Sequence, residues 1–493
     1  MKAYSQIEKI FEKLDIIDNI SSILSWDSSV IMPSGGHEAR TKQLCYLTSS
    51  SHDILSSPEI GDLIIAAKNE QDLNSWQKAN LRLMDKLYKE QNSLDKALKE
   101  IFSEATSNCE MVWREARQNN DYKLLIPIFK EVIKLTREIS TVKSESLNCS
   151  KYDALLDSYD PGRKSAQIDQ IFANLAIFLK DKIPQIIDFQ AKQNIIPFTH
   201  KYEIEKQKEL GVDCMNKFGF DFSRGRLDIS LHPFCGGTPT DVRITTRYDE
   251  SEFISSLCGI LHEAGHGIYE QNLPKEWISQ PVGKALGMAM HESQSLLVEM
   301  QLCRSKPFLN WLEKSVISIF GDKAEHKKDN LYNHVNKVAR SLIRVDADEV
   351  TYPCHVMLRY ELEKLIINNE LEAEDLPSAF NEKMQQYLGI SPTDDKNGCM
   401  QDIHWPSGFF GYFPCYTMGA LIAAQVFAKI KTLPTDLDKK IENGEFQVIF
   451  DWLRTNIHNY GSLLSVDDLL LKSTGTIVDI ECYKNYIDKK YLF

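Results

Sequence analysis

Apolar residues recur every three or four positions along most of the chain. Ile7, Ile10, Phe11 and Leu14 are one example within residues 1–210. This spacing places apolar side chains on one face of an α-helix, whereas a half-buried strand would alternate them with polar residues. It therefore predicts amphipathic helices that pack on one another, without the fixed-length repeat of a solenoid.

The period changes over residues 225–248, where Leu227 and Ile229, and later Val242, alternate with polar side chains. Such alternation predicts β-strands. The segment 235–239 between the two alternating runs contains two glycines and a proline, which is the composition of a turn. Because the helical period resumes beyond this segment, the sequence predicts a mainly α fold with a small β-hairpin or sheet.

No stretch rich in proline, glycine or serine divides the 493 residues into separate domains. We expect a single domain, 1–493, in which 1–210 form a helical wall or lid and 211–493 form the catalytic portion. Hydrophobic residues make up 43% of the chain and charged residues 26%, which is typical of a soluble globular protein with a substantial core.

Charge, apolar stretches and cysteine content indicate which partners and which location to expect. A net charge of −13 disfavours binding to nucleic acid or to an anionic membrane surface. The N-terminal residues lack the apolar core of a signal peptide, and the most apolar later stretch, 418–427, is about half the ~20 residues of a membrane-spanning helix. The 11 cysteines include no Cys-x-x-Cys pair, which indicates reduced thiols. We therefore expect a cytoplasmic protein.

The strongest chemical signal is an HExxH motif, His262-Glu263-Ala264-Gly265-His266, within a predicted helix over 252–270. Four residues are just over one helical turn, so His262 and His266 project from one face, about 6 Å apart along the axis. This arrangement suits two nitrogen ligands of one zinc ion. Glu263 is rotated about 100° from His262 and is placed to accept a proton from a zinc-bound water.

A catalytic zinc needs a third protein ligand. No histidine follows His266 at the short spacing of the metzincins, so a more distant carboxylate is required. A second predicted helix, 286–302, carries His291 and Glu292. Glu292 is the natural third ligand, although a solvated glutamate is the alternative, and His291 is a neighbour that orients a ligand. Glu299, two turns further on the same face, is a candidate to support a ligand or is simply solvated.

Six motifs stand out along the chain. They are His232-Pro233-Phe234, Asp241-Val242-Arg243-Ile244-Thr245, the HExxH pentad, His291-Glu292-Ser293-Gln294, Ile343-Arg344-Val345-Asp346-Ala347-Asp348 and Gly398-Cys399-Met400-Gln401-Asp402-Ile403-His404-Trp405. With these motifs the chain resembles the Taq-type thermostable carboxypeptidase family. The likeness extends outward over nearly the whole chain.

The resemblance implies a zinc metallocarboxypeptidase with a neurolysin-like helical fold. It assigns zinc binding to His262, His266 and Glu292, and catalysis to Glu263. It also implies a deep substrate groove closed at one end, a β-hairpin beside the zinc helix, peptide substrates and a homodimer. Cobalt or manganese is compatible with the same ligands.

Two arginines are candidates to bind the C-terminal carboxylate of a substrate, because a planar guanidinium suits a carboxylate. Arg243 lies on the predicted hairpin, whose polar face, with His232, can hold substrate backbone; the alternative is a surface strand with an internal Asp241–Arg243 pair. Arg344 is followed by several acidic residues, so an ion pair on a helix surface is as good an interpretation as a carboxylate clamp.

The stretch 401–416 concentrates His404, Tyr412 and Tyr416 among glycines and prolines, which favours a loop or active-site wall over a helix. A tyrosine hydroxyl can donate to the oxyanion of a tetrahedral intermediate. Both tyrosines remain candidates for this role, and both can also simply pack.

Three alternatives to a carboxypeptidase differ in where, or whether, they cut. A zinc oligo- or dipeptidase of the same helical type would cut further from the terminus. An aminopeptidase is disfavoured, because the Gly-Ala-Met-Glu-Asn-type motif is absent and Gly287-Met288-Ala289-Met290 is only superficially similar. A non-catalytic binding protein on this scaffold is disfavoured by Glu263, since such a protein has no use for a base beside the metal.

Overall fold

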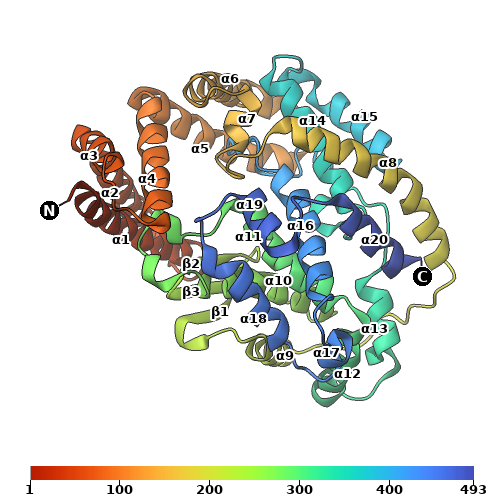
Figure 1. The fold of residues 1–493 in the computed structure, drawn as a ribbon. Helices are drawn as coiled ribbons and strands as arrows, with labels where there is room; N and C mark the ends of the chain where they lie inside the picture. Colours follow the sequence, from red (N-terminus) through yellow and green to blue (C-terminus); the bar gives the residue numbers. More distant parts are fainter. Residues whose placement is uncertain (1, 493) are drawn as a thin grey trace.

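The computed structural model describes residues 2–492, and over that range the chain is built mainly from α-helices. This confirms the mainly α class that the hydrophobic spacing predicts. Figure 1 shows a small sheet toward one side of the molecule, between α1 and α10. In the described part of the chain, no helix is both long and apolar enough to span a bilayer. All eleven cysteines are free thiols.

The helices that precede the sheet enclose two separate apolar clusters. They are α1 (Ala3–Val30), α2 (His37–Leu55), α3 (Pro58–Lys68), α4 (Ser75–Ser93), α5 (Lys96–Asn119), α6 (Tyr122–Leu147), α7 (Lys151–Leu156), α8 (Ser165–Gln190) and α9 (Ile204–Phe218). The smaller cluster comes from α1, α3, α4 and the loop between the last two, whereas the main core begins in α5. The N-terminal helices are joined to the rest by contacts such as the stacked rings of Trp76 and Trp277, whose centroids are 5.6 Å apart.

The sheet contains β1 (Gly225–Ile229), β2 (Cys235–Thr238) and β3 (Asp241–Thr246) in the order β1-β3-β2. The small sheet is confirmed, but its pairing differs from a simple hairpin. β1 runs parallel to β3, and β2 pairs antiparallel with β3. The segment that reads as a turn is therefore mostly strand β2. Its glycine content is needed for close packing, because a Cβ on Gly237 (φ +86°) would lie 2.1 Å from the carbonyl oxygen of Asp241.

Two helices that follow the sheet carry the HExxH motif and the candidate third ligand. They are α10 (Ile254–Gln271) and α11 (Gly287–Leu296), and α11 continues as the π-helix η5 (Leu297–Cys303). Both helices predicted in this region are present. Gly265, inside the HExxH motif, lets them cross closely, because a Cβ there would lie 2.6 Å from Cα of Ser295 and 2.7 Å from the carbonyl oxygen of Gln294.

The remaining helices follow α11 in the chain. They are α12 (Lys306–Phe320), α13 (Lys328–Val335), α14 (Tyr352–Ile367), α15 (Leu376–Leu388), α16 (Pro414–Ile430), α17 (Leu437–Glu442), α18 (Gln447–Asn456), α19 (Val466–Thr474) and α20 (Ile480–Tyr491). Of these, α16 packs along α11. A Cβ on Gly419 of α16 would lie 2.9 Å from Cβ and Cγ of Glu292, so this glycine brings α16 into direct contact with that side chain.

Candidate metal centre and active site

His262, His266 and Glu292 converge at the crossing of α10 and α11. Nε2 of His266 lies 3.5 Å from Oε2 of Glu292, and Nε2 of His262 lies 4.0 Å from Oε1 of the same carboxylate. One potential ligand atom from each residue lies within 4.8 Å of the others. Two imidazole nitrogens and a carboxylate oxygen, with the side chains mostly shielded from solvent, fit a catalytic divalent metal that keeps a position open for water or substrate.

Each ligand histidine is held through its other ring nitrogen. Nδ1 of His262 lies 2.9 Å from Oε2 of Glu299. Nδ1 of His266 lies 2.6 Å from Nδ1 of His291, whose Nε2 lies 2.7 Å from Oε1 of Glu270. These partners fix the two rings with Nε2 directed toward Glu292, which is the arrangement that metal-bound histidines adopt.

The electrostatics of the cluster match a cation site. Although burial acts in the opposite direction, Arg304 and His262 hold the pKa of Glu299 down, to about 2, so this carboxylate stays charged. Burial lowers the pKa of His266 to about 4, which leaves its imidazole neutral and able to bind a metal. Burial also acts to lower the pKa of His262, but Glu299 and Glu292 raise it to about 10, so metal binding would displace a proton there.

Glu263 is buried beside this cluster, with only 7% of its surface exposed. Burial raises its pKa to about 7; His262 opposes this shift and Glu292 adds to it. A carboxylate with a pKa near neutrality can both accept and return a proton. These properties suit a general base, and the assignment of that role to Glu263 stays a prediction.

Arg344 belongs to a second buried cluster. Its Nε and Nη2 donate to Oδ1 of Asp402 over 2.9 and 2.8 Å, and its Nη1 donates to the hydroxyl of Tyr352 over 2.6 Å. Arg359 donates to the other oxygen of Asp402 over 2.7 Å. The ion pair of Arg344 is thus formed with a distant buried aspartate rather than with the neighbouring acids on a helix surface.

Tyr416 contacts Arg344, and His404 and Tyr412 pack against Tyr416. The hydroxyl of Tyr416 lies 3.2 Å from Nε2 of His404, and the guanidinium of Arg344 lies 5.1 Å from the centroid of the Tyr416 ring. The rings of Tyr412 and Tyr416 meet edge to face, with centroids 5.3 Å apart. Tyr416 lies one helical turn before Gly419, which contacts Glu292, so this cluster flanks the metal centre.

Arg243 and His232 lie apart from that cluster. Arg243 on β3 donates to both carboxylate oxygens of Asp241, over 3.0 and 2.7 Å, and its guanidinium lies 4.6 Å from the ring centroid of Trp26 in α1. His232 is exposed in the connection after β1. The internal Asp241–Arg243 pair that was the alternative expectation for a surface strand is therefore present, and Trp26 lies against the guanidinium of Arg243.

Four residues that support the metal cluster or the Arg344 cluster were not identified from the sequence. They are Glu270, Arg304, Tyr352 and Arg359. Glu270 and Arg304 had a local signal, because Glu270 follows His266 by one turn in the same helix and Arg304 follows Glu299 by five residues. Tyr352 contacts Arg344 across eight residues, and Arg359 is brought near Asp402 by the fold.

A His-His-Glu cluster formed where an HExxH helix crosses a second helix, inside a mainly helical fold, defines a metallopeptidase. The chain belongs to the family described as carboxypeptidase Taq (M32) metallopeptidase, whose sequence profile matches residues 6–491. It is 35% identical to thermostable carboxypeptidase 1 of Thermus thermophilus, over 99% of this chain and 98% of the relative. It is 34% identical to carboxypeptidase 1 of Bacillus subtilis, over 100% and 99%.

A solved structure gives the same result. Metallocarboxypeptidase 1 of Trypanosoma cruzi aligns with a TM-score of 0.96 and 37% identity, and the alignment covers 100% of both chains. The predicted family, fold class and enzyme class are therefore confirmed: the chain is a metallocarboxypeptidase with a divalent metal.

Proposed function

We propose that the metal is a single zinc ion held by His262, His266 and Glu292, and that the enzyme releases single amino acids from the C-terminus of peptides. The observation that carries this proposal is the convergence of the three side chains, with Nε2 of both imidazoles turned toward one carboxylate. Cobalt and manganese accept the same ligands, so the ion in the cell also depends on supply.

The residues around the ion divide the chemical work. When bound, zinc would polarise the scissile carbonyl and lower the pKa of water to near 7. Glu263 takes a proton from the attacking water and returns it to the leaving amine. Glu299 and His291 hold the ligand histidines in orientation.

Arg344 is our candidate for the group that binds the terminal carboxylate. Three of its N–H groups serve Asp402 and Tyr352, which leaves two of the five donors of a guanidinium for a substrate. It lies in the cluster that flanks Glu292, whereas Arg243 lies on β3 against the ring of Trp26. We assign Arg243 and His232 to the substrate backbone.

Tyr412 and Tyr416 are the candidate donors to the oxyanion. Both hydroxyls have a pKa raised by burial and remain protonated, as a donor must. Burial lowers the pKa of His404 to about 4, so it is a neutral partner for Tyr416. The deep groove, the homodimer, the cytoplasmic location and the division at residue 210 rest on the family resemblance and the sequence, and stay predictions.

The proposal is tested by metal analysis of the purified protein together with amino-acid release from a peptide, before and after chelation. We expect about one zinc per chain, release of one residue at a time, and loss of release on chelation that zinc restores. Internal cleavage of a peptide blocked at both ends would favour the oligopeptidase alternative. Zinc binding without any cleavage would favour a binding protein.

A further inference from the structure

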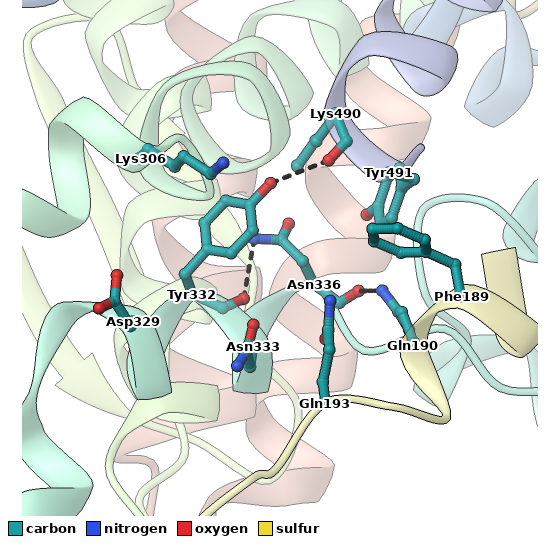
Figure 2. Close-up of a pocket in the computed structure, with 10 residues that line it drawn as sticks. All are labelled: Phe189, Gln190, Gln193, Lys306, Asp329, Tyr332, Asn333, Asn336, Lys490 and Tyr491. Carbon is teal, nitrogen blue, oxygen red and sulfur yellow. Dashed lines mark hydrogen bonds between the residues drawn. The ribbon is translucent and has the colours of Figure 1, made fainter. Parts of the chain in front are cut away.

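A second pocket, of about 270 Å³, opens between the end of α8, α13, α20 and the first residue of α12 (Figure 2). No residue of the HExxH motif lines it, and neither Arg344 nor its neighbours do. The pocket therefore has no place in peptide hydrolysis as described above.

Asn336 gives this pocket an unused hydrogen-bond acceptor. The side chain is only 2% exposed, and its Nδ2 donates to the carbonyl oxygens of Arg304 and Tyr332 over 3.1 and 3.0 Å. Those two bonds set the orientation of the amide. Within residues 2–492, Oδ1 has no donor. Because a buried acceptor without a partner is costly, the pocket suits a ligand that brings an N–H group.

The pocket also offers one unused charge of each sign. Lys306 Nζ and the carboxylate of Asp329 form no hydrogen bond or ion pair with any described residue, although the Lys306 ammonium lies 5.2 Å from the centroid of the Tyr332 ring. Lys490, in contrast, is already neutralised by its ion pair with Glu349. A ligand with a separate cation and anion matches this pair.

Three aromatic rings supply the apolar surface. Figure 2 shows the amide of Asn336 lying between the ring of Tyr332 on one side and those of Phe189 and Tyr491 on the other. A polar floor between apolar walls is the usual composition of a small-molecule site. The volume of about 270 Å³ holds one amino acid rather than a peptide.

We propose that this pocket binds a free α-amino acid with a large apolar side chain. The carboxylate pairs with Lys306, the ammonium group donates to Oδ1 of Asn336 and is attracted by the negative charge of Asp329 in the same pocket, and the side chain packs on Phe189 and Tyr491. Free amino acids are the products of a carboxypeptidase, so such a ligand accumulates where this enzyme works. The proposal does not depend on which residues carry out hydrolysis.

Titration calorimetry of the zinc-loaded enzyme with L-phenylalanine tests the site. We expect binding that becomes about tenfold weaker in Lys306→Ala and in Asp329→Asn, because each removes one charged contact. Lys328→Ala, which removes an exposed lysine of α13 that does not line the pocket, is the matched control and keeps the affinity. Thermal unfolding of each variant checks that it is folded.

Two analogues of the ligand test which of its charged groups are recognised, and the variants separate this pocket from the zinc centre. L-phenylalaninamide lacks the carboxylate and N-acetyl-L-phenylalanine lacks the ammonium, so the affinity of both for the wild type falls, by about tenfold or more. Phenylalanine that binds Lys306→Ala and Asp329→Asn as tightly as the wild type would be bound at the zinc centre, and the proposal would fail. Absence of binding to the wild type would equally overturn it.

Discussion

The carboxylate of Glu299 lies 2.9 Å from Nδ1 of His262, and its other oxygen receives the guanidinium of Arg304. This contact fixes the ring of a metal ligand from behind. We predict that Glu299→Gln, which keeps an acceptor but loses the charge, lowers zinc affinity by about tenfold to a hundredfold. Competition with a chelator measures it, and Glu382→Gln on the exposed face of α15 is the control. Unchanged affinity would remove Glu299 from the support of the metal.

Replacement of Glu263 and replacement of Glu292 are predicted to have different effects on turnover and on zinc content. Glu263→Gln keeps the three ligands, so zinc content stays near one equivalent while turnover falls by about a hundredfold or more, as expected for a general base. Glu292→Ala removes a charged oxygen ligand, so zinc content falls. Metal analysis and kcat on the same preparations separate the two effects. Full turnover in Glu263→Gln would rule out the proposed base.

Gly419 is predicted to matter through Glu292. A methyl group at this position would lie 2.9 Å from Cβ and Cγ of Glu292, so Gly419→Ala displaces the ligand or the helix α16. We expect weaker zinc binding together with lower activity. Gly35→Ala is the control, because a Cβ at Gly35 meets nothing within 4 Å. An alanine variant at 419 with normal zinc affinity would show that the two helices separate without moving the ligand.

Asp402 is predicted to be a main source of stability in the second cluster. Although burial acts the other way, Arg344 and Arg359 hold its pKa well below the usual range. Asp402→Asn leaves two buried guanidinium groups without a counter-charge, which costs about 3–5 kcal/mol in the free energy of unfolding at pH 7. Asp72→Asn, which removes an exposed ion pair with Lys2, is the control and costs little.

The pH dependence of that difference has a definite sign. Because the folded-state pKa of Asp402 is lowered, its stabilisation is complete above the unfolded-state value of about 4 and is lost as the pH falls below it. Denaturant titrations should therefore show the gap between wild type and Asp402→Asn narrowing below about pH 4. A gap independent of pH would mean that the carboxylate is not preferentially charged in the folded state.

The direction of attack is tested with paired peptides. If Arg344 binds the terminal carboxylate, amidation of the substrate leaves a buried guanidinium donor without its partner, so amidated peptides are nearly inert. N-acetylation matters little. Arg344→Ala abolishes most of this discrimination by slowing the free-acid peptide, and Arg243→Ala retains it. Equal rates for free and amidated peptides would favour an oligopeptidase with the same metal chemistry.

The candidate metal centre could be predicted from the sequence because its proposed ligands follow local geometry. The spacing of His262 and His266 is set by one helical turn, and the third ligand lies on a second apolar-faced helix nearby. The ion-pair partner of Arg344 could not be predicted from the sequence, because only the tertiary fold brings Asp402 near it. The acidic residues that follow Arg344 in the sequence suggested local ion pairs instead.

The strand pairing of the sheet is a second feature that the sequence could not predict. Alternation of apolar and polar residues is the same for parallel and antiparallel strands, so the parallel pairing of β1 with β3 left no trace in the pattern. Strand β2 contains Gly236 and Gly237, and its lack of bulky side chains resembles a turn. Hydrogen bonds between backbones, which no side-chain pattern records, decide both features.

The side chain and the backbone of Arg304 contact different sites. Its guanidinium holds Glu299 behind the metal ligand His262, and its carbonyl oxygen receives the amide of Asn336 in the second pocket. One residue thus touches both sites. Linkage then requires reciprocity: if an amino acid in that pocket changes the affinity for zinc by some factor, zinc changes the affinity for the amino acid by the same factor. In that case the metal-free enzyme would bind the free amino acid with a different affinity from the zinc-loaded enzyme.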